Sequence, residues 1–461
     1  MYITRQIIIS GDHPLYGYLD DHAHMAKLLY NAALFRIRQI FTGYGRDLLS
    51  VNEKEVFSEV RLLEAAYPSI RVKRVIGYSH LEKLMRVTGN PDYFRGLPMQ
   101  TAQHVLKKAC QDFSSWLKAL RKYKASPEDF RGKPRMPHYV KSDTCTFGIT
   151  NQDAVLYPVK DETGSIKGYE LKLPKTKVRH MLTGGFLQGN LKEMTVKPYY
   201  GRYILGIVME VKSDAVSAAG TNMAGIDFGI DNIAAIACTD GSSVIYKGGA
   251  ILSENRKNAI LKAKYTGMIT KGHNIKSAHS SMLESISFRH ANFCRDQLHK
   301  ISTSIVRWCL RHEVGILVLG TNRYWKQNCS LGKVNNRNFT AMPIARLREM
   351  IIYKAETCGM TVSLQEESYT SRADITAMDY IPLYGKDDAG AIFSGKRIRR
   401  GLYRCHNGLL VNADLNAAAN ILRKAVPDAW KTTDDFRFLS SPEVSGFHEL
   451  NPQSIVQRLR A

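Results

Sequence analysis

Two aspartates stand where the surrounding backbone would hold a carboxylate in a fixed place. Asp227 lies in MAGIDFGIDNIAAIACTDG, a pattern that indicates a buried strand, a turn between glycines and a second apolar strand. Asp414 opens a run with helical spacing, ADLNAAANILRK. Four residues of this run would face a sheet: Leu415, Ala418, Ala419 and Leu422. Each aspartate could hold a metal ion, although Asp also serves turns and is a preferred helix N-cap residue.

The two positions together predict more than either does alone. One carboxylate after an early strand and another at the start of a late helix form the arrangement that a ribonuclease-H-like site uses to bind paired metal ions. The stretches GIDFGIDNIAAIA and NADLNAAANIL resemble the first and third RuvC motifs of the transposon-encoded TnpB family, and the resemblance extends up to about residue 425. TnpB proteins are RNA-guided DNA nucleases related to the type V CRISPR effectors.

The overall composition favours a nucleic-acid partner. The 461 residues contain 65 Lys and Arg against 42 Asp and Glu, and the resulting net charge of +23 suits a polyanion. On charge alone, a ribosomal or membrane-surface protein is the alternative. The eight cysteines form no CxxC pair, so we expect reduced thiols and a cytoplasmic protein. No apolar run reaches the roughly 18 residues of a membrane span, so we expect no membrane partner.

The resemblance implies an α/β multidomain architecture. A strand pattern precedes three helical stretches, at 19–42, 52–66 and 99–122, and further strand patterns follow them, which suits a barrel with a helical insertion. The expected parts are a wedge β-barrel (1–14 and 130–215), an inserted helical recognition lobe (15–129), an RNase H-like (RuvC) nuclease domain (222–371 and 405–425), an insertion (372–404) and a loosely ordered C-terminal tail (426–461).

The chain departs from this family between its two motifs. The apolar strand VGILVLG would end the second motif, where most TnpB proteins carry Glu, but Gly320 and Thr321 stand there. In the next strand, TVSLQEESYTS, Glu366 and Glu367 come just before a Tyr-Thr-Ser that the family shows at the corresponding place. Neighbouring strands lie about 4.8 Å apart, and a Glu side chain can span much of that gap. We therefore expect Glu367 as the third carboxylate and Glu366 as the lower-ranked alternative, although two Glu at a strand end also suit a solvated edge.

A second departure concerns zinc. Family members usually continue from TSxxC into a four-cysteine zinc ribbon, whereas the corresponding segment here contains only Cys405, beside His406. Tetrahedral zinc requires four Cys or His ligands, so we expect no zinc. The insertion would instead fold around an apolar core: Ile381, Leu383, Tyr384, Ile392, Phe393 and Leu402.

Basic and aromatic side chains on several elements are candidates for nucleic-acid binding. They lie on the third long helix, on the last barrel hairpin, in the helical part of the nuclease domain and in the insertion. The alternative for each is a solvated basic face or ordinary cross-strand packing. The candidates are Lys107, Lys108, Lys118, Arg121, Tyr199, Tyr200, Arg202, Lys276, Arg289, Lys396, Arg397, Arg399 and Arg400.

The resemblance implies an RNA-guided DNA endonuclease of a prokaryotic transposable element. Its guide RNA would derive from the element end and pair with double-stranded target DNA beside a short target-adjacent motif. Asp227, Glu367 and Asp414 would bind two Mg²⁺ ions, with Mn²⁺ as a substitute. The alternative, which Gly320 favours, is a nuclease-inactive protein that uses its guide RNA to repress transcription. A transposase acting in its own right is a third and weaker interpretation.

Overall fold

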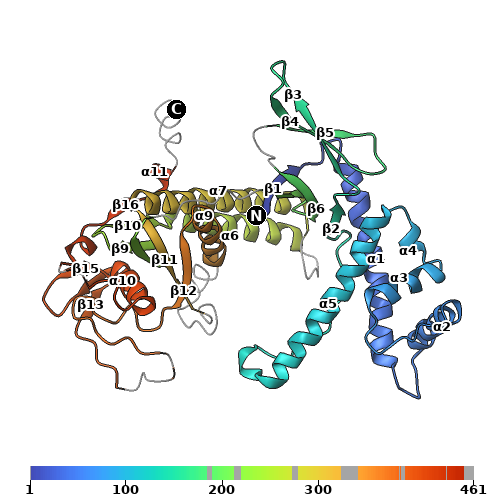
Figure 1. The fold of residues 1–461 in the computed structure, drawn as a ribbon, viewed down its shortest axis with the longest axis horizontal. Coiled ribbons are helices and arrows are strands. Elements are labelled where there is room, and N and C mark those ends of the chain that lie inside the picture. Colours follow the sequence, from blue (N-terminus) through green and yellow to red (C-terminus); the bar gives the residue numbers. More distant parts are fainter. Residues whose placement is uncertain are drawn as a thin grey trace. The chain divides into compact units, whose positions relative to one another are not determined.

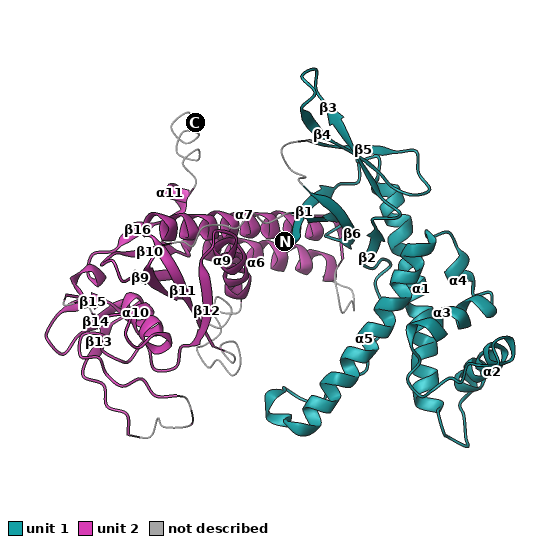
Figure 2. Cartoon of the chain, viewed as in Figure 1, with its two compact units in different colours: residues 1–213 teal, residues 214–461 magenta. Residues whose placement is uncertain are grey.

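The computed structural model describes residues 2–183, 189–211, 220–271, 279–322, 341–383, 385, 390–431, 433 and 435–450. The chain forms two compact units, Met1–Ser213 and Asp214–Ala461 (Figure 2). Both contain helices and sheets, so the mixed α/β class predicted from the sequence is confirmed. None of the described helices is long and apolar enough to cross a membrane.

Long helices and two small sheets build the first unit (Figure 1). Apolar stripes along the helices make its core, in which Leu29, Ile37 and Phe113 are buried. The helices are α1 (Tyr16–Gly43), α2 (Val51–Ala66), α3 (Tyr78–Val87), α4 (Pro91–Phe94), α5 (Met99–Ala125) and the 3₁₀ turn η1 (Pro127–Asp129). The strands are β1 (Tyr2–Ile9), β2 (Phe147–Thr150), β3 (Val155–Lys160), β4 (Ile166–Lys172), β5 (Arg179–Thr183), β6 (Asn190–Pro198) and β7 (Tyr203–Glu210).

The described strands of the first unit do not close into the predicted barrel. Four of them form an antiparallel sheet in the order β1-β7-β6-β2. Strands β3, β4 and β5 form a separate sheet, and in the part of the chain that the structure describes no ladder joins β2 back to β1. The four-stranded sheet is therefore open among the described residues, and β3, β4 and β5 pair with one another instead of extending it.

A six-stranded mixed sheet forms the centre of the second unit, in the order β12-β11-β8-β9-β10-β16. Strands β12, β11 and β8 are parallel, β9 is antiparallel to β8 and β10, and β16 is parallel to β10. The strands are β8 (Asn222–Asp227), β9 (Asn232–Cys238), β10 (Ser243–Lys247), β11 (Val314–Thr321), β12 (Thr361–Glu366) and β16 (Glu443–Ser445).

Different helices cover the two faces of this sheet. Successive strand residues point to opposite faces, so each strand contributes side chains to both layers. Residues such as Ile236 and Leu319 pack with α7 and α9, whereas Ala235 and Val318 pack with α10. Gly225 allows α10 to approach β8, since a Cβ there would lie 2.2 Å from the carbonyl oxygen of Ala418. The helices of the unit are α6 (Gly249–Thr270), α7 (Ser281–Arg311), α9 (Ile344–Thr357), α10 (Ala413–Ala425), η2 (Arg437–Leu439) and α11 (Phe447–Leu450).

The segment after α10 is packed rather than loosely ordered. Trp430 is 2% exposed and its Nε1 donates to the carbonyl oxygen of Ala419 at 3.0 Å. Leu439 is also buried, and β16 extends the sheet beside β10. The prediction of a loosely ordered tail is therefore wrong up to β16. Isolated aromatic residues, whose sequence context is typical of a loop, cover an apolar side of α10. Residues 451–461 lie outside the described residues.

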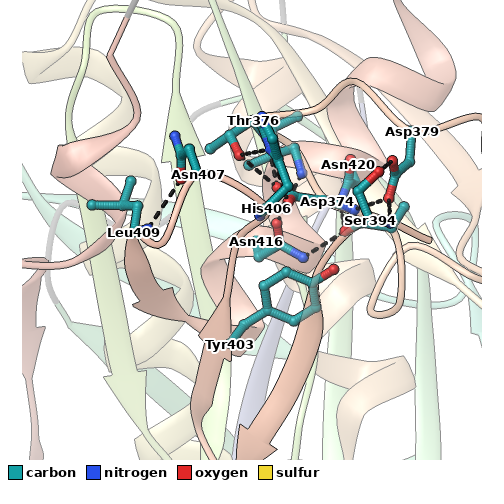
Figure 3. Close-up of polar contacts among 12 residues, drawn as sticks. Asp374, Thr376, Asp379, Ser394, Tyr403, His406, Asn407, Leu409, Asn416 and Asn420 are labelled. Carbon is teal, nitrogen blue, oxygen red and sulfur yellow. Dashed lines mark hydrogen bonds and ion pairs between the residues drawn. The ribbon is translucent and has the colours of Figure 1, made fainter.

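Two carboxylates organise the insertion by accepting hydrogen bonds (Figure 3). Asp374 accepts from the backbone N–H groups of Thr376 and His406, at 2.9 and 2.6 Å, and from the Thr376 hydroxyl. Asp379 accepts from the backbone N–H groups of Asp374 and Ser394. Burial alone would raise the pKa of Asp374, but these hydrogen bonds hold it below its ordinary value.

The predicted apolar core of the insertion is wrong at two positions, whereas Ile381, Phe393 and Leu402 are half-buried. Ile392 is 87% exposed and Leu383 is 44% exposed, while Tyr384 lies outside the described residues. Buried apolar residues of the insertion include Ala373, Ile375 and Tyr403, and the Tyr403 hydroxyl donates to the backbone carbonyl oxygen of Arg372. A short sheet of β13 (Lys396–Arg399), β14 (Leu402–Arg404) and β15 (Leu410–Asn412) leads from this network into α10.

Candidate active site

The ends of three parallel strands meet at one edge of the six-stranded sheet. β8 ends at Asp227, β11 at Thr321 and β12 at Glu366. The ladder between β11 and β12 sets Gly320 opposite Gln365, so Glu367 comes just beyond the end of its strand. Because parallel strands end at the same edge, side chains there can converge on one ligand.

Asp227 experiences the strongest electrostatic effects at this edge. Burial raises its pKa well above the ordinary value, and the negative charges of Glu367 and Asp414 raise it further. The positive charge of Arg397 and the backbone N–H of Phe228 act in the opposite direction. Glu367 and Asp414 therefore lie close enough to Asp227 for their charges to act on it, and a bound cation would relieve that repulsion.

The Glu367 side chain lies against Gly320 of the neighbouring strand. A Cβ at position 320 would come within 2.8 Å of Glu367 Oε2 and within 2.8 Å of Ile421 Cδ1. The missing side chain thus leaves the space that the Glu367 carboxylate occupies. Burial raises the pKa of Glu367 to about 7, although the Arg348 guanidinium lowers it. Arg348 also donates to the Gly320 carbonyl oxygen at 3.2 Å.

Glu366 has partners of its own. Its Oε2 pairs with Lys424 Nζ at 2.8 Å and its Oε1 accepts from the backbone N–H of Ser368 at 2.7 Å. The Lys424 side chain is only 6% exposed, so Glu366 compensates a nearly buried charge. Of the two neighbouring glutamates, Glu367 is the one whose charge acts on Asp227.

Asp414 lies in the first turn of α10 and is not its N-cap. Asn412 is the N-cap, and its side chain accepts from the backbone N–H groups of Asp414 and Leu415. The Asp414 carboxylate has other partners: Asn232 Nδ2 donates to its Oδ2 at 2.7 Å, and the Arg397 guanidinium lies 3.5 Å from its Oδ1. Asn232 was not predicted as a site residue. The one feature of the sequence that could have indicated it is an amide side chain five residues after Asp227.

The donor chemistry of this edge fits magnesium. Among the described residues, no group of three or more His, Cys, Asp or Glu side chains is arranged to hold a metal ion. Magnesium needs fewer protein ligands, because one or two carboxylates, water and phosphate oxygens complete its octahedron. Carboxylates are the hard oxygen ligands that it prefers, and two of them adjoin Asp227 closely enough to shift its pKa.

The predicted nucleic-acid-binding residues of α5 fall into two groups. Lys118 and Arg121 are exposed. Lys108 is paired within the helix, and Lys107 lies 5.1 Å from the centre of the Tyr78 ring. The C-terminal half of α5, which carries Lys118 and Arg121, therefore offers the more accessible charges.

The turn between β6 and β7 keeps its predicted aromatic pair together. The ring centres of Tyr199 and Tyr200 are 4.8 Å apart, and Tyr200 is 42% exposed. Arg202 donates to the carbonyl oxygen of Tyr200 at 3.2 Å. The turn presents an exposed ring of the kind that stacks on a base.

The candidates of the second unit include a basic hairpin beside the carboxylates. Lys396, Arg397 and Arg399 lie on β13 and Arg400 in the turn that follows, and all four are exposed. Besides the contact of Arg397 with Asp414, Arg400 pairs with Asp231 at 2.6 Å. Arg289 is exposed on α7, and Lys276 lies outside the described residues.

Two family models match the second unit and the end of the first. OrfB_IS605, described as a probable transposase, matches residues 206–326, which include Asp227 and Gly320. The Cas12f1-like TNB domain matches residues 345–421, which include Glu367, Asp374 and Asp414. All three candidate carboxylates lie within these matched segments.

One relative is the CRISPR-associated endodeoxyribonuclease Cas12f1 of Sulfoacidibacillus thermotolerans, 27% identical over 177 residues. The match covers 38% of this chain and 37% of that relative, so it spans well under two thirds of the relative's length. Among solved structures, a Cas12f1–sgRNA–target DNA complex is 13% identical, with 88% of this chain and 82% of that chain covered and a TM-score of 0.48. A CRISPR-Cas12f ternary complex is 14% identical, with 85% and 81% covered and a TM-score of 0.31.

The matched models are those of a probable transposase and of a Cas12f1-like TNB domain. Together with the Cas12f1 relative, they support a TnpB-like family related to the type V CRISPR effectors. The family predicted from the two motifs is thereby confirmed.

Proposed function

We propose that this protein is an RNA-guided, magnesium-dependent DNA endonuclease whose RNase H-like (RuvC) site consists of Asp227, Glu367 and Asp414. The observation that carries the proposal is the placement of these carboxylates at one sheet edge, where Glu367 follows the end of β12 and the charges of Glu367 and Asp414 act on Asp227 at the end of β8. The family matches across both segments and the endodeoxyribonuclease named for the relative support the same chemistry.

In this proposal Asp227 and Asp414 hold magnesium from a strand end and from the first turn of a helix, and Glu367 contributes from the neighbouring strand. Bound magnesium would activate a water molecule and stabilise the departing 3′ oxygen. The chain supplies rigid supports for the oxygen ligands, with Gly320 leaving the space for Glu367. Arg397 places a guanidinium beside Asp414, where it could pair with a phosphate oxygen.

The proposed partners are a guide RNA derived from the element end and a double-stranded DNA target beside a short target-adjacent motif. Exposed basic residues on α5, α7 and β13 and the net charge of +23 support phosphate contacts. The guide would read sequence by base pairing, while the protein recognises backbone shape and charge. A cytoplasmic, nucleoid-associated location follows from these partners.

The nuclease-inactive alternative relied on the loss of a carboxylate at Gly320. The position of Glu367 weakens that argument, because its carboxylate fills the space beside Gly320. We therefore propose the nuclease rather than the repressor.

The proposal can be tested with the purified full-length protein. We expect a tightly bound RNA, whose sequencing identifies the guide, and magnesium-dependent cleavage of a matching DNA duplex. DNA binding should weaken steeply as salt rises, because many phosphate contacts release counterions. Protein that carries no RNA and binds any duplex equally well would contradict the guided mechanism.

A further inference from the structure

Asn232 links two charged groups at the edge that carries Asp227. It opens β9, and its Nδ2 donates to Asp414 Oδ2 at 2.7 Å. Its Oδ1 accepts from Lys247 Nζ at 2.8 Å. Lys247 ends β10 and lies opposite Asn232 in the antiparallel ladder, where the register shifts. The ladder therefore places the lysine within reach of the amide.

The chemistry of these partners fixes the orientation of the amide. An ammonium group can only donate hydrogen bonds, and a carboxylate can only accept them. Turning the Asn232 amide over would set its NH₂ against Lys247 and its oxygen against Asp414, and both hydrogen bonds would be lost. Lys247 thus ensures that an N–H group faces the carboxylate.

The backbone of Asp414 is fixed as well. Asn412 caps α10 and accepts from the backbone N–H of Asp414 at 3.0 Å. With its backbone held by Asn412 and its Oδ2 held by Asn232, the Asp414 carboxylate has little freedom to rotate. The Arg397 guanidinium approaches the other oxygen, Oδ1, at the longer distance of 3.5 Å.

We infer that Asn232, oriented by Lys247, is a positioning residue that occupies Asp414 Oδ2 and leaves Oδ1 as the oxygen for a divalent cation. The inference rests on the proposed function, because it assigns a role within the same carboxylate site. Hydrogen-bond partners of metal-binding side chains orient those side chains, and removing such a partner typically costs about 10- to 100-fold in metal affinity.

The test measures Mn²⁺ affinity of the guide-bound protein by electron paramagnetic resonance of the free ion, independently of cleavage. Asn232→Ala should weaken Mn²⁺ binding about 10- to 100-fold. Lys247→Met should weaken Mn²⁺ binding less, because the Asn232 amide remains but can turn over. Lys247→Arg should bind Mn²⁺ as the unmodified protein does, because the arginine again supplies a donor to the amide oxygen. The matched control is Lys431→Met, which removes another exposed lysine, paired with the surface residue Asp428.

Thermal unfolding without metal separates positioning from a purely structural role, which would lower the melting temperature and leave Mn²⁺ affinity unchanged. Should Asn232→Ala fail to fold, Lys247→Met carries the test, because the Lys247 side chain is exposed. Folded Asn232→Ala or Lys247→Met with the affinity of the unmodified protein would overturn the inference. If Asp414→Ala also left Mn²⁺ binding unchanged, the proposed site itself would be wrong.

Discussion

Gly320→Ala is the change that tests most sharply how Glu367 reaches the site. The new methyl group would lie 2.8 Å from Glu367 Oε2, 2.8 Å from Ile421 Cδ1 and 3.1 Å from the Ile226 carbonyl oxygen. The two closest atoms end flexible side chains, so both can move. To regain the 3.4 Å at which ordinary contact begins, the carboxylate must move by about 0.6 Å.

A displacement of this size matters more for catalysis than for folding. Catalytic groups must be held within about 0.5 Å, and a shift of about 1 Å can cost about 100-fold. We therefore expect magnesium-dependent cleavage to fall about 10- to 100-fold. Overpacking costs about 1–3 kcal/mol, and we expect the lower end of that range, or a fall of about 2–4 °C in melting temperature.

The assay compares single-turnover cleavage with guided DNA binding for the same preparation, and binding should be unchanged. Gly267→Ala is the matched control, because a Cβ at that position on α6 meets nothing within 4 Å. A folded Gly320→Ala protein that cleaves as fast as the unmodified protein would refute the argument that Glu367 needs this space.

Three further predictions concern single side chains. In the metal-free folded protein the pKa of Glu367 is raised to about 7. Between about pH 4.3 and pH 7, Glu367 therefore holds a proton in the folded state that it has lost in the unfolded state. Stability should therefore fall as pH rises from about 4.5 to about 7, and Glu367→Gln should remove this part of the fall in thermal unfolding across that range; equal pH profiles would contradict it. Asp374→Ala leaves the backbone N–H groups of Thr376 and His406 without their acceptor. The free energy of unfolding in urea should therefore fall by about 3–5 kcal/mol. A zinc chelator should leave the stability of the unmodified protein unchanged. Trp430→Ala should cost about 3–5 kcal/mol in the same assay, and a loss below about 1 kcal/mol would mean that the segment after α10 contributes little to the core.

The sequence was informative where apolar periodicity is long and uninterrupted. The runs that predicted helices at 19–42, 52–66 and 99–122 correspond to α1, α2 and α5, and VGILVLG corresponds to the central strand β11. These elements bury one continuous face, and such a face leaves a regular pattern in the sequence. The same kind of pattern predicted that Asp227 lies where a buried strand meets a turn, and β8 ends at that residue.

Elements held by hydrogen bonds or by isolated side chains could not be predicted in this way. The insertion depends on Asp374 and Asp379, which accept backbone hydrogen bonds, and hydropathy does not register such contacts. Trp430 lies in a segment whose composition resembles a loop, yet one buried indole fixes it to α10. Asn232 becomes significant only when strand register brings it beside Asp414 and Lys247.

The central claim is that Asp227, Glu367 and Asp414 act as one metal site that cleaves guided DNA. The most direct measurement is single-turnover cleavage by Asp227→Ala, Glu367→Gln, Asp414→Ala and the double variant Asp227→Ala/Glu367→Gln, with guided DNA binding measured in parallel. We predict that each single change abolishes cleavage, that the double variant loses nothing more, and that DNA binding persists in all four, because the carboxylates act as a unit. Cleavage that survives Glu367→Gln, or an unmodified protein that binds its guided target and does not cleave it with magnesium or manganese, would contradict the claim.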